Sequence, residues 1–590
     1  MALFTPSASP AVTVKEIDLT GVVPNVQTST GAYVGNFGWG PVGVATLVSD
    51  ETGLVSTFSA PIDANSVDFH SAAYFLRYSN SLYVVREQDS DARNAVANHT
   101  SLGSVTAQTI GNRDAFEALA LDSSDGAFIA KFPGIIGNSL KVSITGTDSA
   151  NGSLTNFNAW AYKGSFDGAP GTSPFATGVG ASNDEIHIAV IDEIGDITGT
   201  PGTVLETFPY LSVASNAKSP DGTSNYFKDV LKNRSAWIYA GQLHSGDSDA
   251  TSDLGGRNTD WGNPAVDARD FKTGGNATNM QDTWSFASGI TSSSLGTDDV
   301  LRGFDKFEDK DNIEVDFLIA PESLADATAT TVVNDLVATA ASIRKDCVAV
   351  ASPSRNAVIT LGTNAGVLAC NNTYTKSSYL VQDNNYIKVF DKYNDKYIKI
   401  PAASSTAGLM AATDLVAAPW FSPAGSRRGR YLGITDIVVS PTKAERDALY
   451  KVGINPIANI PGEGIMLFGD KTNESRPSAF DRINVRRLFL AVERAISIAG
   501  RNVMFEFNDE FTRAEFVNIV EPFLREIQGR RGITDFRVIC DTTNNTPAVV
   551  DRNEFIASIF IKPARSINYV TLNFVAVRTG VEFEEVVGTV

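Results

Sequence analysis

Three short apolar runs in the chain have the length and composition of buried strands. They are residues 81–86 (SLYVVR), 315–320 (VDFLIA) and 347–351 (CVAVA), and none alternates regularly with polar residues as a half-exposed strand would. Residues 331–344, between the second and third runs, have helical apolar spacing at Val333, Leu336, Val337 and Ala340. A strand, a helix and a second buried strand predict a βαβ unit with parallel strands. We expect an α/β layer that is completed by the strands before residue 88.

Residues 89–305 differ in character from the segments on either side. They are dense in Gly, Ser, Asp, Asn and Thr, and their apolar runs are short: 127–131, 140–144, 186–191 and 236–240. This pattern predicts an inserted, β-rich domain with long surface loops. The insertion would divide a middle α/β domain into residues 23–88 and 306–425.

The last 160 residues contain the clearest helical patterns. Thr442 and Glu445 form a capping box for a helix that ends at Gly453. Asp481 is the expected cap of a second helix, whose apolar stripe is Val485, Leu488, Phe489, Val492 and Ile496. A second capping box is predicted at residues 512–515 (TRAE). It would begin a third helix with the stripe Phe516, Ile519, Val520, Phe523, Leu524 and Ile527, and Pro522 should kink that helix.

Strands are expected after these helices and at both ends of the chain. Runs at 536–541, 554–562 and 567–577 predict a small sheet, and the last of them alternates Val570, Leu572, Phe574 and Ala576 on one face. Residues 10–18 (PAVTVKEID) and 581–590 (VEFEEVVGTV) predict extended arms. The fold class is therefore α+β and multi-domain: an N-terminal arm (1–22), the divided middle domain, the β-rich insertion, a C-terminal α/β domain (426–578) with a small sheet and two amphipathic helices, and a C-terminal arm (579–590).

Charge is distributed unevenly along the 590 residues. Residues 427–590 contain 22 basic and 21 acidic residues and therefore have a net charge of +1. Since the whole chain has a net charge of −19, residues 1–426 have a net charge of −20. An acidic surface repels phosphate, which argues against direct nucleic-acid binding. A balanced, Arg-rich region suits contacts between proteins; a neutral domain beside an acidic one with no shared purpose is the alternative.

Composition also limits the compartment and the chemistry. No apolar run is long enough to span a membrane, and residues 1–12 lack the pattern of a signal peptide. Three distant cysteines, Cys347, Cys370 and Cys540, are typical of a chain folded in a reducing cytoplasm. The histidines are isolated: His70, His99, His187 and His244. Neither a nucleophile elbow nor a complete phosphate-binding loop occurs, so we expect no catalytic residue, no metal site and no cofactor.

Several long segments resemble the tail sheath protein of contractile-tailed bacteriophages, most closely the T-even type. The C-terminal segments are DKYNDKYIKIP (391–401), SPAGSRRGR (422–430), FGDKTNESRPSAFDRINVRRLF (468–489), CDTTNNTPAVVDRNEF (540–555) and FIASIFIKPARSINYVTLNFVAV (555–577). The front of the chain is similar at PAVTVKEID, FGWGPVG and AKFPGIIGNSLKVSI. The pattern departs from the family between residues 90 and 305, where the outermost insertion of the T-even relatives is absent or reduced.

This resemblance implies a structural role without catalysis. Sheath subunits form hexameric rings stacked helically around a tail tube, and they contract to drive the tube through the host envelope for genome ejection. The C-terminal domain would lie innermost and the insertion outermost. The implied partners are further copies of the chain, the tail tube protein, and the baseplate and tail terminator proteins, with no direct nucleic acid and no membrane insertion. The subunit would assemble in the host cytoplasm and be part of the virion tail.

The resemblance also implies that the arms of one subunit add strands to the C-terminal sheet of another. The candidate arm residues are Val12, Val14, Ile17, Phe583, Val586 and Val587. The candidate residues of the receiving sheet are Phe555, Ala557, Ile559, Val570, Leu572 and Phe574. Frayed termini are the alternative interpretation of the arms.

The polar sides of the two long helices are candidates for contact with the tube. Their residues are Arg482, Arg486, Glu493, Arg513, Asn518 and Arg525, and solvent exposure or salt bridges within the subunit are the alternative for each. Two further functions stay open from the residues alone: the sheath of a related contractile particle, such as a bacteriocin or a secretion system, and a surface hydrolase with residues 90–305 as its substrate domain.

Overall fold

The chain is a mixed α/β protein with several sheets, and its residues fall into two compact units. The computed structural model describes residues 29–97, 108–119, 126–146, 155–241, 261–271 and 281–568. Of these, the larger unit contains residues up to 416 together with 423–481, and the smaller unit contains 417–422 and 482–568. The C-terminal domain expected at 426–578 and the smaller unit thus share residues 482–568.

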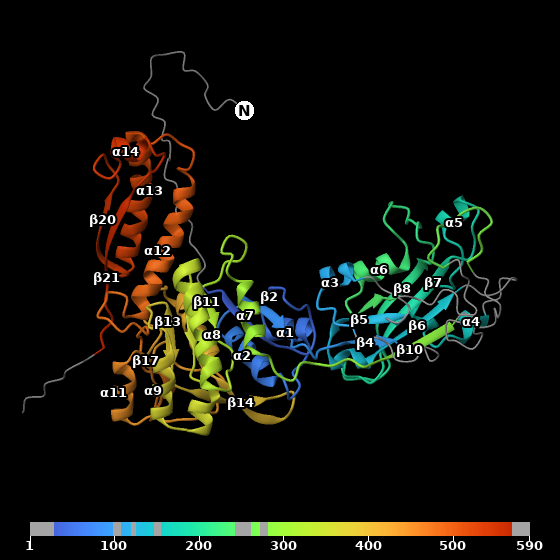
Figure 1. Ribbon diagram of the computed structural model, residues 1–590, viewed down its shortest axis with the longest axis horizontal. Helices are drawn as coiled ribbons and strands as arrows, with labels where there is room; N and C mark the ends of the chain where they lie inside the picture. The colour runs from blue at the N-terminus through green and yellow to red at the C-terminus, as the bar shows by residue number, and fades with distance from the viewer. Residues whose placement is uncertain are drawn as a thin grey trace, which may run out of the picture. The chain divides into compact units, whose positions relative to one another are not determined.

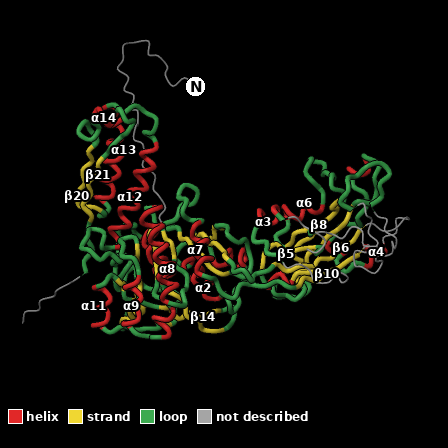
Figure 2. The backbone as a smooth tube through the Cα atoms, viewed as in Figure 1, coloured by secondary structure: helices red, strands yellow, loops and turns green. Residues whose placement is uncertain are grey.

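A seven-stranded sheet organises the larger unit (Figures 1 and 2). In spatial order its strands are β17 (Ile454–Asn455), β13 (Leu380–Asp383), β12 (Val348–Ala351), β11 (Phe317–Ile319), β1 (Gly31–Asn36), β3 (Leu82–Glu87) and β2 (Thr46–Val48). All neighbours are parallel except β2, which is antiparallel to β3. The predicted βαβ unit and its completion by strands before residue 88 are confirmed, because β11 pairs with both β12 and β1.

Helices cover both faces of this sheet, which explains why its strands are continuously apolar. One face packs against α7 (Thr297–Asp305), α8 (Asp326–Ala338) and α9 (Asn364–Thr373). The other face packs against α2 (Ser66–Leu76) and α10 (Ala403–Val416). A Cβ at Gly31 would come within 2.7 Å of the Phe75 ring, so glycine permits the close approach of β1 to α2. The expected helix at 331–344 begins five residues earlier, and its second half, Thr339–Arg344, is a π-helix.

A second, wholly antiparallel sheet lies within the predicted insertion. Its spatial order is β8 (Thr203–Ser212), β7 (Glu185–Asp192), β6 (Leu140–Gly146), β10 (Gln281–Ala287), β4 (Asn94–Ala97), β5 (Phe128–Pro133) and β9 (Ile238–Ala240). The strands predicted at 127–131, 140–144, 186–191 and 236–240 correspond to β5, β6, β7 and β9. Short helices surround it: α3 (Arg113–Ala118), α4 (Thr155–Ala159), α5 (Pro174–Gly178) and α6 (Phe227–Arg234).

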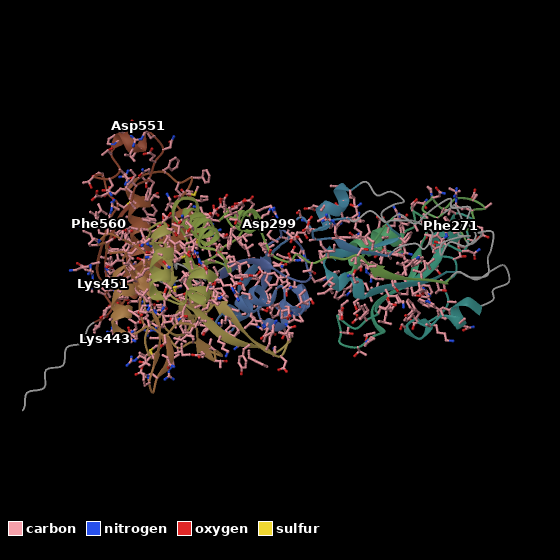
Figure 3. All side chains as sticks on the ribbon, turned by 60° about the horizontal axis from the view of Figure 1, so that its bottom comes forward. Phe271, Asp299, Lys443, Lys451, Asp551 and Phe560 are labelled. Carbon is pink, nitrogen blue, oxygen red and sulfur yellow. The ribbon has the colours of Figure 1, made fainter. Side chains whose placement is uncertain are left out.

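Smaller elements complete the larger unit. The hairpin of β14 (Tyr386–Asp391) and β15 (Lys396–Pro401) pairs with β16 (Asp436–Ile437), and β18 (Ile457–Ile460) pairs with β19 (Gly464–Leu467). Helix α1 (Glu51–Phe58) precedes α2. Helix α11 (Lys443–Lys451) begins with the predicted capping box, in which the side chains and backbone of Thr442 and Glu445 bond reciprocally; its two end lysines are labelled in Figure 3.

The smaller unit contains two long helices, α12 (Ile483–Arg501) and α13 (Glu510–Gly529), and the hairpin of β20 (Ile533–Ile539) and β21 (Ser558–Pro563). A four-residue helix, α14 (Pro547–Val550), lies in the connection between the two strands. Most of each predicted stripe is confirmed, since Leu488, Val492, Phe516, Val520 and Leu524 share one buried cluster. Phe489 and Ile519 are only partly buried and lie outside that cluster. Pro522 lies inside α13 as expected.

Two of the predicted helix starts are wrong. Helix α12 begins after Arg482, without a side-chain cap, and Asp481 lies one residue further upstream. In α13 the cap is Asp509, whose Oδ1 accepts from the Thr512 backbone N–H at 2.8 Å. Thr512 is therefore already helical and only 7% exposed. Any of Ser, Thr, Asp and Asn can cap a helix, so Asp509 competes with Thr512 for that role, and the earlier start adds most of a turn.

Candidate assembly interface

Among the described residues, the histidines and cysteines that could support chemistry lie buried in the packing of the chain. In the part of the chain that the structure describes, no group of three or more His, Cys, Asp or Glu residues could hold a metal ion. The three cysteines are buried, and none of them forms a disulfide bond. His187 is buried against Phe166, with Nε2 2.8 Å from the Gly168 carbonyl oxygen. His99 and His244 lie outside the described residues. No helix among those described is long and apolar enough to cross a membrane.

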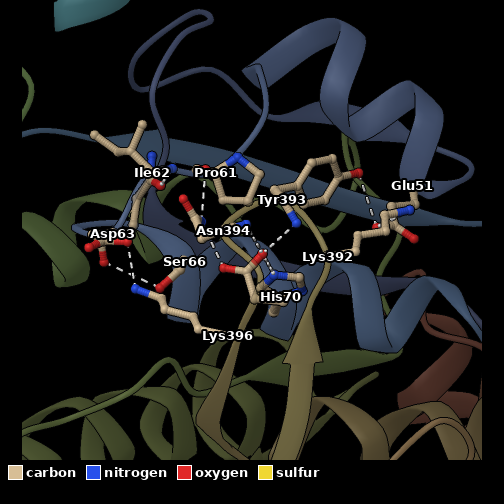
Figure 4. Close-up of polar contacts among 12 residues, drawn as sticks. Glu51, Pro61, Ile62, Asp63, Ser66, His70, Lys392, Tyr393, Asn394 and Lys396 are labelled. Atoms are coloured by element: carbon tan, nitrogen blue, oxygen red, sulfur yellow. Dashed lines mark hydrogen bonds and ion pairs between the residues drawn. The ribbon is translucent and has the colours of Figure 1, made fainter.

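His70 instead binds the β-turn of the DKYNDKYIKIP segment (Figure 4). Its Nε2 lies 3.1 Å from Oδ1 of Asp391, and both side chains are buried. Asn394 donates to Oδ2 of Asp391 at 2.8 Å and to the Pro61 carbonyl at 3.2 Å. Tyr393 donates its hydroxyl to Glu51 at 3.2 Å. This segment therefore ties the β14–β15 hairpin to the chain between residues 51 and 70, and its role is architectural.

The β20–β21 hairpin of the smaller unit is the described element that corresponds to the expected receiving sheet. Phe536 and Val538 of β20 pair with Ile561 and Ile559 of β21 and belong to the cluster formed with α12 and α13. Alternate residues, among them Arg537 and Phe560, lie on the opposite, exposed face. One face of the hairpin is thus fixed by the helices, and the other is open to solvent.

Within the part of the chain that the structure describes, no third strand pairs with either long edge of this hairpin. Among the described residues, β20 has only β21 as a strand neighbour and β21 has only β20. An edge strand presents backbone N–H and C=O groups that a third strand can pair. A two-stranded hairpin alone is also marginal in water, so an added strand would stabilise it.

The predicted assembly residues divide between those the structure describes and those it does not. Of the receiving set, Ile559 lies in β21, and Phe555 and Ala557 precede that strand in the same apolar cluster. Outside the described residues lie Val570, Leu572 and Phe574, and with them all the arm residues: Val12, Val14, Ile17, Phe583, Val586 and Val587.

The predicted tube-facing residues differ in exposure. Arg486 and Arg513 are buried, at 7% and 9% exposure, and Arg482 is partly buried. Glu493, Asn518 and Arg525 are exposed. Asn518 and Arg525 are seven residues apart in α13 and therefore lie on the same side of that helix; Arg525 is 3.9 Å from Glu521 in an i,i+4 ion pair.

Arg513 and two asparagines join the start of α13 to the segment before β21. Arg513 donates from Nε to the side-chain oxygen of Asn508 at 2.7 Å, and Asn508 donates to the Glu554 carbonyl at 2.8 Å. Asn545, which is 3% exposed, exchanges two hydrogen bonds with the Ile556 backbone at 2.8 and 2.9 Å. These bonds hold the hairpin on the helices, and sequence reasoning missed both asparagines because asparagine in a polar loop has no distinguishing pattern.

Sequence reasoning also missed a group of exposed apolar residues in the connection from α12 to α13 and in the first turn of α13. Met504, Phe505, Phe507 and Phe511 are 58%, 101%, 84% and 74% exposed. Four large apolar residues within eight positions, outside the helical stripes, are the signal that could have identified this segment.

Comparisons with known proteins agree with the resemblance. Residues 294–473 match the family model of the phage tail sheath protein central domain, and residues 475–576 match that of the phage tail sheath C-terminal domain. The chain is 31% identical to the tail sheath protein of Vibrio phage KVP40, over 98% of this chain and 99% of the relative. It is also 31% identical to the tail sheath protein of Enterobacteria phage T4, over 98% and 99% of the two chains.

A solved structure has a similar fold. The crystal structure of the sheath tail protein Lin1278 from Listeria innocua matches with a TM-score of 0.52 and 10% identity. The match covers 91% of this chain and 96% of that protein. At this identity the likeness concerns the fold alone.

Proposed function

This chain belongs to the tail sheath proteins of contractile bacteriophage tails, and from that membership we propose that it forms hexameric rings stacked around a tail tube. Contraction of this sheath would drive the tube through the host envelope for genome ejection. The observation on which the proposal depends is similarity over nearly the whole chain and the whole length of the relatives. Proteins of this family are structural components of the virion and are not enzymes, so the surface-hydrolase alternative is set aside.

The proposed link between subunits is strand addition at the β20–β21 hairpin. Residues 10–18 of one subunit and 581–590 of another would pair with its open edges, as the resemblance implies. Ordering ten arm residues costs on the order of 10–20 kcal/mol of backbone entropy. Burying three apolar side chains returns roughly 1.5–3 kcal/mol each, and each new hydrogen bond about 1 kcal/mol. One arm is therefore near balance, and a lattice in which each subunit gives two arms and receives two is stabilised by multivalency.

Weak, multiple links of this kind suit contraction. Rigid domains can repack into a lattice that buries more surface while the arms keep neighbouring subunits connected as hinged tethers. The proposed domain organisation of the subunit has five parts. They are an N-terminal arm (1–22), a middle domain (23–88 and 306–425), an outer insertion (89–305), an inner domain (426–578) and a C-terminal arm (579–590). The tube contact is proposed at the exposed members of the predicted set, Glu493, Asn518 and Arg525.

The proposed partners are further copies of the chain, the tube protein, and the baseplate and terminator proteins. The sheath of a related contractile particle, such as a bacteriocin or secretion system, is the second candidate. Capsid and terminase genes beside the gene for this chain would support the phage tail, and their absence would support the second candidate.

Electron microscopy of the purified full chain tests the proposal. We expect negative-stain images to show tubular polymers or rings, and deletion of residues 1–18 or 580–590 to abolish them. A subtler pair of variants separates strand pairing from chain length. Val12→Asp with Val14→Asp should prevent polymers, whereas Ser7→Asp with Ser9→Asp, which adds the same charge to the same arm outside the expected strand, should not. A full-length chain that stays monomeric at high concentration would contradict the proposal.

A further inference from the structure

The segment that follows α12, together with the first two residues of α13, presents an aromatic, acidic tip. Residues 502–511 (NVMFEFNDEF) contain three phenylalanines, three acidic residues and no basic residue. Phe505 is fully exposed, and its φ of 70° is unfavourable for a bulky side chain. Such strain persists only where the surrounding structure holds it, and it concentrates at binding sites.

The base of this tip is held in place while its aromatic rings are not covered. Asp509 caps α13, and Asn508 is bound by Arg513 and to the Glu554 carbonyl. Phe505 and Phe507, which directly precede these anchors, are 101% and 84% exposed. A preordered apolar surface binds a partner at a lower entropic cost than a flexible one.

The outer face of the β20–β21 hairpin has the opposite charge and an exposed ring of its own. Phe560 of β21 is 58% exposed and lies opposite Arg537 of β20; its position is labelled in Figure 3. Lys562 lies opposite Asp535 on the same face. The face thus carries two cations and one carboxylate around a phenyl ring, against three carboxylates and three phenyl rings on the tip.

We propose that the tip of one copy, residues 502–511, binds the outer face of the β20–β21 hairpin of a second copy. The occupant is a second copy because the two surfaces are complementary in charge and both stay exposed within one chain. Acidic residues of the tip would approach Arg537 and Lys562, and the phenylalanines would cover Phe560. Strand addition uses the edges of the hairpin, so its outer face stays available to the tip.

Because the tip and the hairpin face are different surfaces, this contact is heterologous and repeats from copy to copy. The tip–hairpin contact would join sheath subunits without involving the arms. It rests on the proposed function in one respect, that the subunits form a polymer. Two measurements, a cross-link and a charge exchange, separate it from strand addition.

The first measurement is a cross-link between two single-cysteine variants of the full chain. Met504→Cys in the tip and Asp535→Cys on the hairpin face leave the three phenylalanines, Arg537, Phe560 and Lys562 intact, and the native cysteines are buried. With a short bismaleimide, we expect the mixture to form a linked dimer at least about tenfold more than a mixture of Met504→Cys with Asp436→Cys. Asp436 is an exposed strand residue of β16 and so provides a matched control. Phe505→Ser with Phe507→Ser in the tip should remove the excess.

The second measurement exchanges charge across the proposed contact. Glu506→Lys with Glu510→Lys, or Arg537→Glu with Lys562→Glu, should each raise the protein concentration needed for polymerisation at least about tenfold. Mixing the two variants should restore polymerisation in part, because every tip of one then meets a complementary face of the other. A cross-link no stronger than the Asp436 control, or charge variants that polymerise like the wild type, would overturn the inference. Failure of the wild type to polymerise would instead contradict the proposed function, since the cross-link is measured whether or not tubes form.

Discussion

Asp383 shows how a single residue acquires properties that its sequence context does not indicate. It ends β13 and is fully buried. Its carboxylate accepts from Ser352 Oγ at 2.9 Å, from the Asn385 backbone N–H at 3.1 Å and from Thr406 Oγ1 at 3.1 Å. Burial raises the pKa of Asp383 to about 7, even though these hydrogen bonds oppose the rise. The letters QDNN at 382–385 suggest a solvated turn, and only the packing of β12 and α10 around them makes the site buried.

Asp383→Asn should reduce the pH dependence of stability. The pKa is near 3.9 in the unfolded chain and about 7 in the folded chain, so the folded state binds the proton more tightly. The stability that this proton gives is complete below pH 4 and is lost as the pH rises to 7. An asparagine has no charge to titrate: its Oδ1 can still accept from Ser352 and from the Asn385 N–H, and its Nδ2 would donate to Thr406 Oγ1. Urea unfolding of the variant should therefore change less between pH 5 and pH 8. The exposed substitution Asp311→Asn should leave the wild-type pH profile intact; equal profiles for wild type and Asp383→Asn would contradict the expectation.

At the scale of elements, the sequence located helices well and their first turns less well. The stripes of α12 and α13 are visible because one face of each is apolar at a period of 3.6 residues. Their starts depend on which of several neighbouring polar residues adopts the extended capping conformation. That choice is made by the connection between the two helices, where Asn508 is held by Arg513 and binds the Glu554 carbonyl far along the chain.

The cap of α13 can be tested with two variants. Asp509→Ala should lower the free energy of unfolding of the smaller unit by about 0.5–2 kcal/mol, because it removes the acceptor for the Thr512 N–H. Glu515→Ala should change it by less than about 0.5 kcal/mol, since Glu515 is exposed and is not at the third position of the helix. Thermal unfolding followed by circular dichroism measures both. A larger effect for Glu515→Ala would favour the cap at Thr512.

At the scale of the whole molecule, the chain has separate cores in its two units. Leu524 belongs to the cluster of the smaller unit, and Leu336 to a cluster between the first sheet and its helices. Both side chains are fully buried. Because each unit has a core of its own, the units should unfold in separable transitions.

Core truncations should therefore act on one transition at a time. Leu524→Ala should destabilise the smaller unit by about 2–5 kcal/mol and lower only its transition temperature. Leu336→Ala should lower only that of the larger unit. Differential scanning calorimetry of the unassembled chain measures both transitions, and a parallel shift of the two by either variant would show that the units unfold together.

The sequence by itself determined the features that are periodic or local. The buried strands, the βαβ unit, four strands of the insertion (β5, β6, β7 and β9), most of the helical stripes and the capping box at Thr442 all follow from apolar spacing and turn chemistry within a few residues. Membership of the sheath family follows from long matching segments.

Only the tertiary structure decided which distant segments meet. It brought β17 to the edge of the first sheet, placed Asp391 against His70, buried Asp383, Arg486 and Arg513, and left Phe505 and Phe507 uncovered. These outcomes depend on contacts between residues far apart in the chain. The burial of a polar or aromatic side chain depends on which residues pack against it in space. The residues next to it in the sequence do not indicate which residues those are.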